Sequence, residues 1–244
     1  MIRGFYTAVA GLIANTNRQS VVADNIANVN TAGFKESRTS QSDFELELSR
    51  SMGGRLGPLA TGVRPLGPFL DRTAGPVETT GVPTDLAIDG DGLFVVRSAT
   101  GIAYTRAGNF VLDTTGTLST QAGEPVLGTD GQPIVVQGGA STFSVGADGT
   151  IDGTKLKIAI VAWPQAGLER RGGTLLGSPV GAAAAPGPAV GATVRQGSLE
   201  RSNVDLATAM TELIGYQRSL GLSAKALTIQ DETLGEAVQL GRLH

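Results

Sequence analysis

The stretch of sequence that decides the fold is residues 206–240, LATAMTELIGYQRSLGLSAKALTIQDETLGEAVQL. Leucines recur in it every seven residues, and a second column of residues alternates with them in steps of four and three. The leucine column is Leu206, Leu213, Leu220, Leu227 and Leu234, and the second column is Met210, Gln217, Ala224, Asp231 and Val238. This is the a/d spacing of a coiled-coil seam. We therefore expect one helix of roughly 55 Å that begins behind an Asn203 cap and needs a partner along its seam.

Residues 2–28 carry a second helical pattern with the same alternation of four and three. Its stripe consists of Phe5, Val9, Leu12, Thr16, Gln19, Ala23 and Ile26. Asn and Gly tolerate a left-handed backbone, so we expect this helix to end near Asn28 or Asn30 and the chain to turn at Gly33. Because the two helical patterns flank the rest of the chain, we expect them to pair with each other.

Both helical patterns hold more apolar side chains than one seam can bury. The surplus residues are Tyr6, Ile13, Ile214, Tyr216, Leu222 and Ile229. Helical glycines such as Gly11, Gly215 and Gly221 also cost up to about 1 kcal/mol each relative to alanine. Surplus apolar surface and costly glycines both favour close contacts with neighbouring copies of the chain.

The segment between the helices has the composition of a turn-rich β protein, because the chain holds 35 glycines and only 5% aromatic residues. Short candidate strands alternate with turn pairs such as Asp130-Gly131 and Asp148-Gly149, a pattern typical of antiparallel hairpins. The candidate strands are 85–88, 93–97, 102–106, 109–112, 117–120, 134–136, 142–145 and 155–163.

These patterns predict an α+β fold in which the terminal helices pair as a coiled-coil domain around an inserted antiparallel β-rich domain. The expected helical domain comprises residues 1–35 and 200–244, and the expected β domain comprises residues 76–177. Residues 36–75 are predicted to be a connecting linker with helical character from Ser40 to Met52. Residues 178–199 are predicted to be an Ala/Pro/Gly-rich return linker.

Composition argues against several functional classes. The net charge of -3 and the scattered basic residues do not favour nucleic-acid binding. The chain has no cysteine, and its single histidine is the terminal His244. Cysteine or histidine metal sites and Ser-His-Asp triads are therefore not expected, and neither is a cofactor or a small-molecule substrate. The N-terminal residues lack a clean cleavage site, so we expect no cleaved signal peptide.

Some residues permit a chemical interpretation beside a structural one. Asp89-Gly90-Asp91-Gly92 has a faint calcium-loop pattern, but Leu93 stands where a ligand is needed, so a turn is favoured. A glycosidase would need two carboxylates facing a cleft, whereas candidates such as Asp85 and Asp148 adjoin turns. Trp163 ends an apolar strand and is interpreted as a core or interface residue rather than a sugar platform.

Two ordered motifs flank the β region. The first is Asn25-Ile26-Ala27-Asn28 followed by Thr31-Ala32-Gly33-Phe34-Lys35, and the second runs from Gln196 through Ser202-Asn203-Val204. They resemble the N-terminal and C-terminal signatures of the bacterial flagellar rod and hook family. Residues 80–94 and 104–110 resemble the central β domain of that family, whereas residues 36–75 and 178–195 match it poorly.

The resemblance implies a structural subunit of the flagellar basal-body rod that self-assembles into a helical tube, transmits torque and encloses the export channel. It implies a place in the basal body within the cell envelope and periplasm, and export by the flagellar type III apparatus. The implied partners are copies of the chain and other rod or hook subunits.

The assembly surface expected on the helices consists of Phe5, Val9, Leu12, Ile26, Leu206, Met210, Leu213, Leu220, Leu227 and Leu234. The stretch 71–76 slightly favours a proximal rod subunit, whereas 61–65 resembles a distal one. The alternative function is a secreted adhesin or carbohydrate-binding β domain on a coiled-coil stalk.

Overall fold

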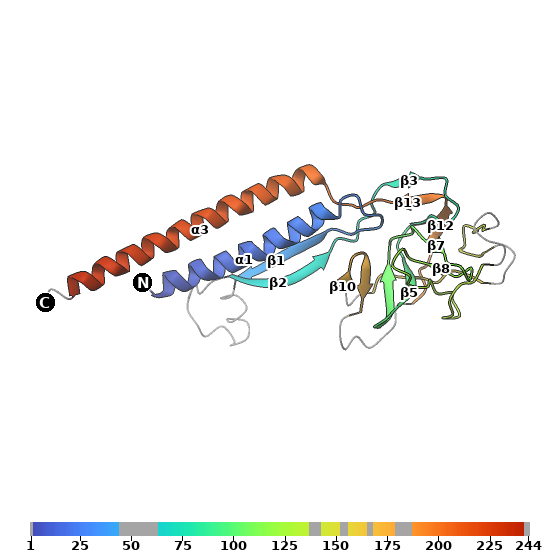
Figure 1. Ribbon diagram of the computed structural model, residues 1–244, viewed down its shortest axis with the longest axis horizontal. Coiled ribbons are helices and arrows are strands. Elements are labelled where there is room, and N and C mark those ends of the chain that lie inside the picture. The colour runs from blue at the N-terminus through green and yellow to red at the C-terminus, as the bar shows by residue number, and fades with distance from the viewer. Residues whose placement is uncertain are drawn as a thin grey trace. The chain divides into compact units, whose positions relative to one another are not determined.

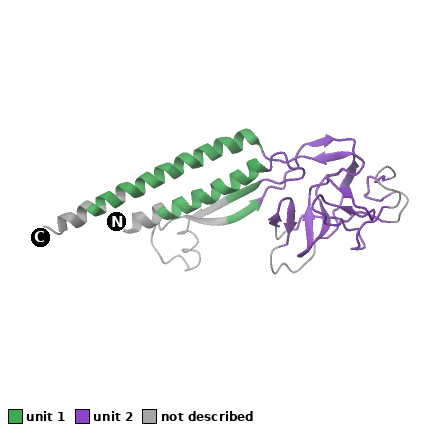
Figure 2. Ribbon diagram, in the orientation of Figure 1, with its two compact units in different colours: residues 1–27, 37–69, 205–244 green, residues 28–36, 70–204 purple. Residues whose placement is uncertain are grey.

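The computed structural model describes the backbone of residues 2–43, 63–136, 143–151, 156–164, 168–178 and 187–241 (Figure 1). The chain divides into two compact units (Figure 2). Unit 1 consists of residues 1–27, 37–69 and 205–244, and unit 2 consists of residues 28–36 and 70–204. The chain therefore passes from one unit to the other four times.

Unit 1 contains the two long helices, which are α1 (Ile2–Ala27) and α3 (Leu206–Gly241). The Asn15 amide donates a hydrogen bond to Ser219 Oγ at 2.9 Å, and the Arg18 guanidinium lies 5.8 Å from the centre of the Tyr216 ring. These two contacts run in opposite directions along the helices, so α1 and α3 are antiparallel (Figure 1). The prediction of two terminal helices is confirmed, and within the described residues neither helix is long and apolar enough to cross a membrane.

The half-buried face of α3 differs from the predicted seam in one of its two columns. Its members are Ala209, Leu213, Tyr216, Leu220, Ser223 and Leu227. Leu213, Leu220 and Leu227 of the leucine column are half-buried as predicted, whereas Leu206 is exposed. The second column lies one residue earlier than predicted, and Met210, Gln217, Ala224 and Asp231 are exposed. The reason is physical: the Tyr216 ring can bury a large area beside Arg18, whereas the Gln217 amide and the Asp231 carboxylate prefer water.

The buried face of α1 differs from its predicted stripe in a similar way. Thr16 and Ala23 of the stripe are exposed, whereas Ala14 and Val22, which lie beside it, are buried. α1 lies between α3 and a ribbon of β1 (Ser37–Asp43) and β2 (Val63–Leu70) in Figure 1. A helix with neighbours on two sides buries a wider surface than one seam.

The cap of α3 is Asp205 and not Asn203, which corrects the sequence prediction. The Asp205 carboxylate accepts hydrogen bonds from the backbone N–H of Ala207 (2.9 Å) and Thr208 (3.4 Å) and from Thr208 Oγ1 (2.9 Å). These bonds lower the pKa of Asp205 below its usual value. Asn203 stands too far ahead of the first helical turn, and its side chain binds other backbone groups.

Unit 2 is built from antiparallel strands, as predicted. Its main sheet has the order β10 (Glu169–Gly172), β11 (Leu175–Gly177), β6 (Gly101–Thr105), β5 (Leu93–Ser98) and β9 (Ile160–Val161). The strand pairs are β12 (Thr193–Gln196) with β4 (Leu86–Asp89), β13 (Ser198–Glu200) with β3 (Val77–Thr79), and β7 (Val111–Leu112) with β8 (Leu118–Ser119). The core is apolar and includes an edge-to-face pair of Phe94 and Phe110 with ring centres 5.1 Å apart.

Several strands were not predicted by the sequence. β1 and β2 lie in the region interpreted as a linker, and the helical character expected from Ser40 is wrong for 40–43, which belong to β1; residues 44–52 lie outside the described part of the chain. β2 contains two prolines, which a two-stranded ribbon tolerates because an edge strand need not use every N–H. β3 and β10 to β13 were also missed, because strands of three or four residues offer almost no periodicity.

Two predicted strands are reduced to single bridges. Val135 pairs only with Thr117, and Val145 pairs only with Ile151. In this part of unit 2 the backbone turns after every few residues, and the bonds between neighbouring turns replace a continuous ladder.

Candidate functional site

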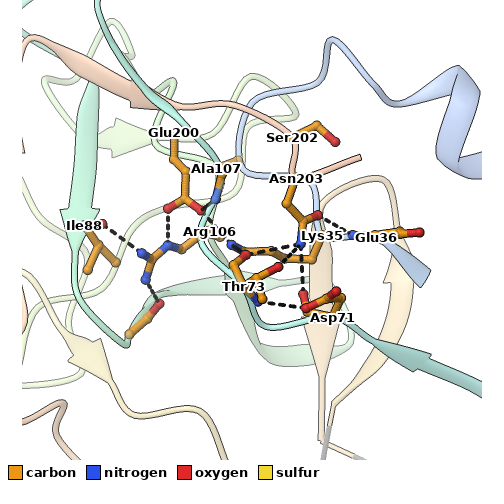
Figure 3. A network of polar contacts seen from close by, with 12 residues as sticks. Lys35, Glu36, Asp71, Thr73, Ile88, Arg106, Ala107, Glu200, Ser202 and Asn203 are labelled. Carbon is orange, nitrogen blue, oxygen red and sulfur yellow. Dashed lines mark hydrogen bonds and ion pairs between the residues drawn. The ribbon is translucent and has the colours of Figure 1, made fainter. Parts of the chain in front are cut away.

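A buried carboxylate, Glu200 on β13, lies at the centre of a polar cluster in unit 2 (Figure 3). Its Oε1 accepts hydrogen bonds from Lys35 Nζ (2.6 Å) and the Gly75 N–H (3.0 Å), and its Oε2 accepts one from Arg106 Nε (2.5 Å). Lys35, Arg106 and Glu200 are all buried. We call Lys35, Arg106, Glu200 and Asn203 the Glu200 cluster.

Burial and the neighbouring charges of opposite sign shift the pKa values of Glu200 and Lys35 in opposite directions. Burial alone would raise the pKa of Glu200, but the Arg106 charge and the Lys35 ammonium outweigh it and hold this pKa below its usual value. For Lys35, burial is the largest effect and lowers the pKa, although Glu200 works in the opposite direction. A charged carboxylate in this place therefore depends on both cations.

Arg106 also fills the turn that resembled a calcium loop. Its Nη1 donates to the Gly92 carbonyl (2.5 Å), and its Nη2 donates to the carbonyls of Ile88 and Gly90 (2.8 Å each). The backbone oxygens of this turn thus face a guanidinium. The described residues contain no group of three or more acidic or histidine side chains that could hold a metal.

Asn203 binds two separate backbone segments within unit 2 (Figure 3). Its Oδ1 accepts from the Glu36 N–H at 2.7 Å, and its Nδ2 donates to the carbonyls of Asp71 (3.3 Å) and Thr73 (3.1 Å). Its neighbour Ser202 accepts a hydrogen bond from the Val204 N–H at 3.3 Å. The C-terminal motif therefore holds the backbone together just before α3 begins.

The N-terminal motif has an equally local structural role. The buried Asn25 amide pairs with the backbone of Ser37 in unit 1, donating to its carbonyl (2.8 Å) and accepting from its N–H (2.9 Å). Thr31 and Asn28 close a turn by a backbone bond of 3.1 Å and a side-chain bond of 3.3 Å. The exposed Ala27 ends α1.

Gly33 and Phe34 complete this motif in unit 2. Gly33 has a φ of 65°, and a Cβ there would collide with the backbone nitrogen of Ala107. The buried Phe34 ring carries the Arg170 guanidinium 4.0 Å from its centre, and Arg170 also donates to the Lys35 carbonyl at 2.7 Å. Only glycine allows this approach of two backbones.

Sequence reasoning missed two of the four cluster residues as site residues. Glu200 and Arg106 both stand inside stretches that resemble the family, but they were not singled out. The sequence offers little signal for either one, because Glu200 stands among polar residues (Ser198, Arg201 and Ser202) and Arg106 directly follows β6. Glu200 and Arg106 are 94 residues apart, so only the fold pairs them.

The residues expected to form the assembly surface fall into two groups. Val9, Leu12, Ile26, Leu213, Leu220 and Leu227 are half-buried, whereas Leu206 and Met210 are 39% and 48% exposed. The side chains of Phe5 and Leu234 lie outside the described ones. In the described parts of α1 and α3, four further large apolar side chains are at least half exposed, namely Ile13 (51%), Ile214 (51%), Leu222 (71%) and Ile229 (51%).

A groove of about 410 Å³ in unit 2 bears on the enzymatic alternative. It is lined mainly by small and polar residues, and the carboxylate among them is Glu124, which accepts a hydrogen bond from Thr120 Oγ1 at 2.8 Å. A glycosidase needs a second carboxylate in the same cleft. Trp163 is half-buried, and the Arg72 guanidinium lies 5.6 Å from its ring centre, where a sugar would otherwise stack.

Three family descriptions match successive parts of the chain. Residues 5–35 match the flagella basal body rod protein family, and residues 87–153 match the D1 domain of the flagellar hook protein FlgE/F/G. Residues 195–240 match the C-terminal region of the flagellar basal body rod FlgEFG proteins. The matched segments cover most of α1 with its following loop, a large part of the core of unit 2, and nearly all of α3.

Similar proteins extend over nearly the whole chain. The flagellar basal-body rod protein FlgG of Bacillus subtilis (strain 168) is 37% identical, with 99% of this chain and 100% of that protein aligned. The rod protein FlgF of Rhizobium meliloti (strain 1021) is 34% identical, and FlgF of Escherichia coli (strain K12) is 31% identical, each with 98% of both chains aligned. The chain therefore belongs to the family of flagellar basal-body rod proteins, of the FlgF and FlgG type.

Proposed function

We propose that this protein is a structural subunit of the bacterial flagellar basal-body rod, self-assembling into a helical tube that transmits torque and encloses the export channel. The observation that carries the assembly is the row of exposed apolar side chains on α3. Leu206, Met210, Ile214, Leu222 and Ile229 stay in water although α1 packs along the same helix. Taking such a side chain from full exposure to full burial is favourable by about 1.5–3 kcal/mol, and these side chains, which are 39–71% exposed, would gain a part of that when neighbouring copies cover them.

The finer organisation forms part of the proposal. The paired helices α1 and α3 act as the coiled-coil axial core, and unit 2, which includes residues 28–35 and 200–204 of the expected helical domain, acts as the β domain. The antiparallel contacts of α1 with α3 and the half-buried heptad face support a coiled-coil pairing. Contacts with other copies form heterologous interfaces, which generate a helical array when the rotation does not close.

The environment of the subunit follows from the same assignment. We place it in the basal body within the cell envelope and periplasm, exported by the flagellar type III apparatus without a cleaved signal. Other rod or hook subunits contact it where the segment of the rod that its copies build meets the next segment. It acts mechanically and not as an enzyme. The proximal rod remains slightly favoured over the distal rod on the sequence of residues 71–76.

Electron microscopy of the purified full chain at raised concentration tests the assembly. We expect tubes or stacks with the terminal helices inside. Leu222→Lys should abolish them because it charges the most exposed apolar position on α3, while Leu222→Met should preserve them. Circular dichroism of both variants should match the parent, since Leu222 is exposed. A discrete trimer with an exposed β domain would instead favour the adhesin alternative and contradict the rod.

A further inference from the structure

Unit 2 is joined to unit 1 by four backbone connections, and three of them are bound to one another inside unit 2. The connections lie at residues 27/28, 36/37, 69/70 and 204/205. Asn203 accepts a hydrogen bond from the Glu36 N–H and donates one to the Asp71 carbonyl. The Asp71 N–H in turn donates to the Glu36 carbonyl at 2.8 Å. Residues 36, 71 and 203, each within two positions of a different connection, thus form one closed set of bonds.

The fourth connection, at 27/28, is followed by a segment that is hydrogen-bonded to Glu200 and Arg201, close to Asn203 in the sequence. Asn30, which follows the 27/28 connection, accepts a hydrogen bond from Arg201 Nη2 at 3.2 Å. The Gly33 N–H donates to the backbone carbonyl of Glu200 at 2.7 Å. Glu200 and Arg201 stand three and two positions before Asn203. All four connections therefore leave unit 2 from segments that are bonded to residues 200–203.

Glu200 anchors this set to the core of unit 2. Its carboxylate holds Lys35 and the Gly75 N–H, which belong to the connecting segments, and Arg106, which directly follows β6. A Cβ at Gly75 would collide with the Arg201 carbonyl oxygen, so these backbones touch without side chains between them. A fully bonded buried polar network is rigid, because each of its bonds would be costly to break alone.

We propose that Asn203 and Glu200 form a clamp that makes the four connections share load. Because the four segments are bonded to one another where they leave unit 2, a force applied to one of them is passed to the other three. Asn203 couples the connections to one another, and Glu200 couples them to the β core. The mechanical part of this inference rests on the proposed rod function, whereas the coupling itself is a property of the chain alone.

Residue-resolved hydrogen exchange of the full chain tests the coupling. In Asn203→Ala, we expect the Glu36 amide to exchange about tenfold faster because it loses its acceptor, and the Asp71 amide to follow. Amides of β5 and β6 should keep their exchange rates. Unchanged protection of the Glu36 amide would overturn the clamp. A uniform loss of protection throughout unit 2 would overturn it as well, because it would mean that Asn203 stabilises the whole unit and not the connections in particular.

Two further variants locate the coupling. Asn203→Asp keeps an acceptor for the Glu36 N–H but replaces the Nδ2 donor to the Asp71 and Thr73 carbonyls by a carboxylate oxygen that repels them. Glu36 should therefore stay protected, while the 71–73 segment moves away and the Asp71 N–H, which donates to the Glu36 carbonyl, exchanges faster. Equal loss at both amides would contradict the assignment of the two atoms. Arg195→Ala is the matched control, since it removes an exposed ion pair with Asp89 (3.2 Å) elsewhere in unit 2. It should leave both amides unchanged.

Load sharing is tested by measuring swimming speed in media of increasing viscosity. The cells are of a motile strain in which the gene for the strain's own rod protein is replaced by the gene for this chain or for one of its variants. With Asn203→Ala we expect basal bodies in normal number but loss of motility at lower viscosity than the parent, while Arg195→Ala tracks the parent. Equal motility at every viscosity, or absence of basal bodies, would overturn load sharing. If the parent chain itself fails to restore motility to a deletion strain, the proposed rod function fails instead.

Discussion

At the scale of single residues, the stability of unit 2 depends on Glu200, a buried carboxylate that pairs with two buried cations, Lys35 and Arg106. Glu200→Gln keeps the size of the side chain but leaves Lys35 and Arg106 as buried charges without their carboxylate. Removing one partner of a buried ion pair costs about 3–5 kcal/mol, so unit 2 should lose stability by about 3 kcal/mol. Trp163, the only tryptophan of the chain, lies in unit 2 and reports its unfolding by fluorescence in denaturant.

The control for this prediction is Arg195→Ala. The Arg195 and Asp89 side chains are 61% and 57% exposed, and pairs of this kind contribute at most about 1 kcal/mol. Equal losses in both variants would mean that the Glu200 carboxylate contributes nothing specific.

The acid dependence of Glu200 has a definite sign. Because its pKa in the folded chain is lowered from 4.5, the unfolded chain binds more protons as the pH falls. Its contribution is therefore complete above the unfolded pKa and is lost as the pH falls through the folded one. The stability difference between the parent and Glu200→Gln should stay constant near neutral pH and shrink in acid. A difference that grew in acid would contradict the direction of the shift.

Sequence alone could not have paired these residues. Lys35 and Glu200 are 165 positions apart, and neither motif shows which carboxylate faces the lysine. Local signals served better. Gly33 was predicted as a turn from its type, and its positive φ confirms this. Local chemistry could be deduced from neighbours in the chain, whereas the buried bonds depend on which strands meet.

At the scale of elements, the start of α3 offers a direct comparison of two residues. Asp205→Ala removes the acceptor for the Ala207 and Thr208 N–H groups, so both amides should exchange faster and the first turn should fray. Asn203→Ala should leave these two amides unchanged, because its side chain binds Glu36, Asp71 and Thr73. Faster exchange at Ala207 in Asn203→Ala would restore Asn203 as the cap.

The α3 seam shows why an element can be predicted correctly and its face incorrectly. The leucine column at 213, 220 and 227 fits an alternation of four and three with either neighbouring column. One choice contains Ala209, Tyr216 and Ser223, and the other contains Met210, Gln217 and Ala224. The hydrophobic pattern alone does not identify the buried column in advance, since each column mixes small, polar and large residues. Tyr216 is half-buried and Gln217 is exposed because α1 offers the tyrosine ring a contact with Arg18. The choice depends on α1, where Arg18 and Asn15 meet Tyr216 and Ser219.

At the scale of the whole molecule, the two units are stabilised by different means. Unit 2 has a closed apolar core and the Glu200 cluster, whereas the described part of α3 buries one narrow face and leaves large apolar side chains in water. Helices stabilised along one face only are marginal on their own. The division suggests a chain in which unit 2 is complete in the monomer and unit 1 is completed by assembly.

Gly221→Ala tests this division, because it should act in opposite directions before and after assembly. A Cβ at Gly221 would meet nothing within 4 Å, so no contact within the described residues explains the glycine. Alanine should stabilise α3 in the dissolved chain by up to about 1 kcal/mol, seen as a higher melting temperature of the helical signal. If a neighbouring helix approaches closely at Gly221, the same methyl group should raise the concentration needed for tubes to form. Ala224→Gly, at a nearby exposed position, should weaken the helix in the monomer and serves as the control. A Gly221→Ala chain that assembled at lower concentration than the parent would show that the glycine is not a point of close approach.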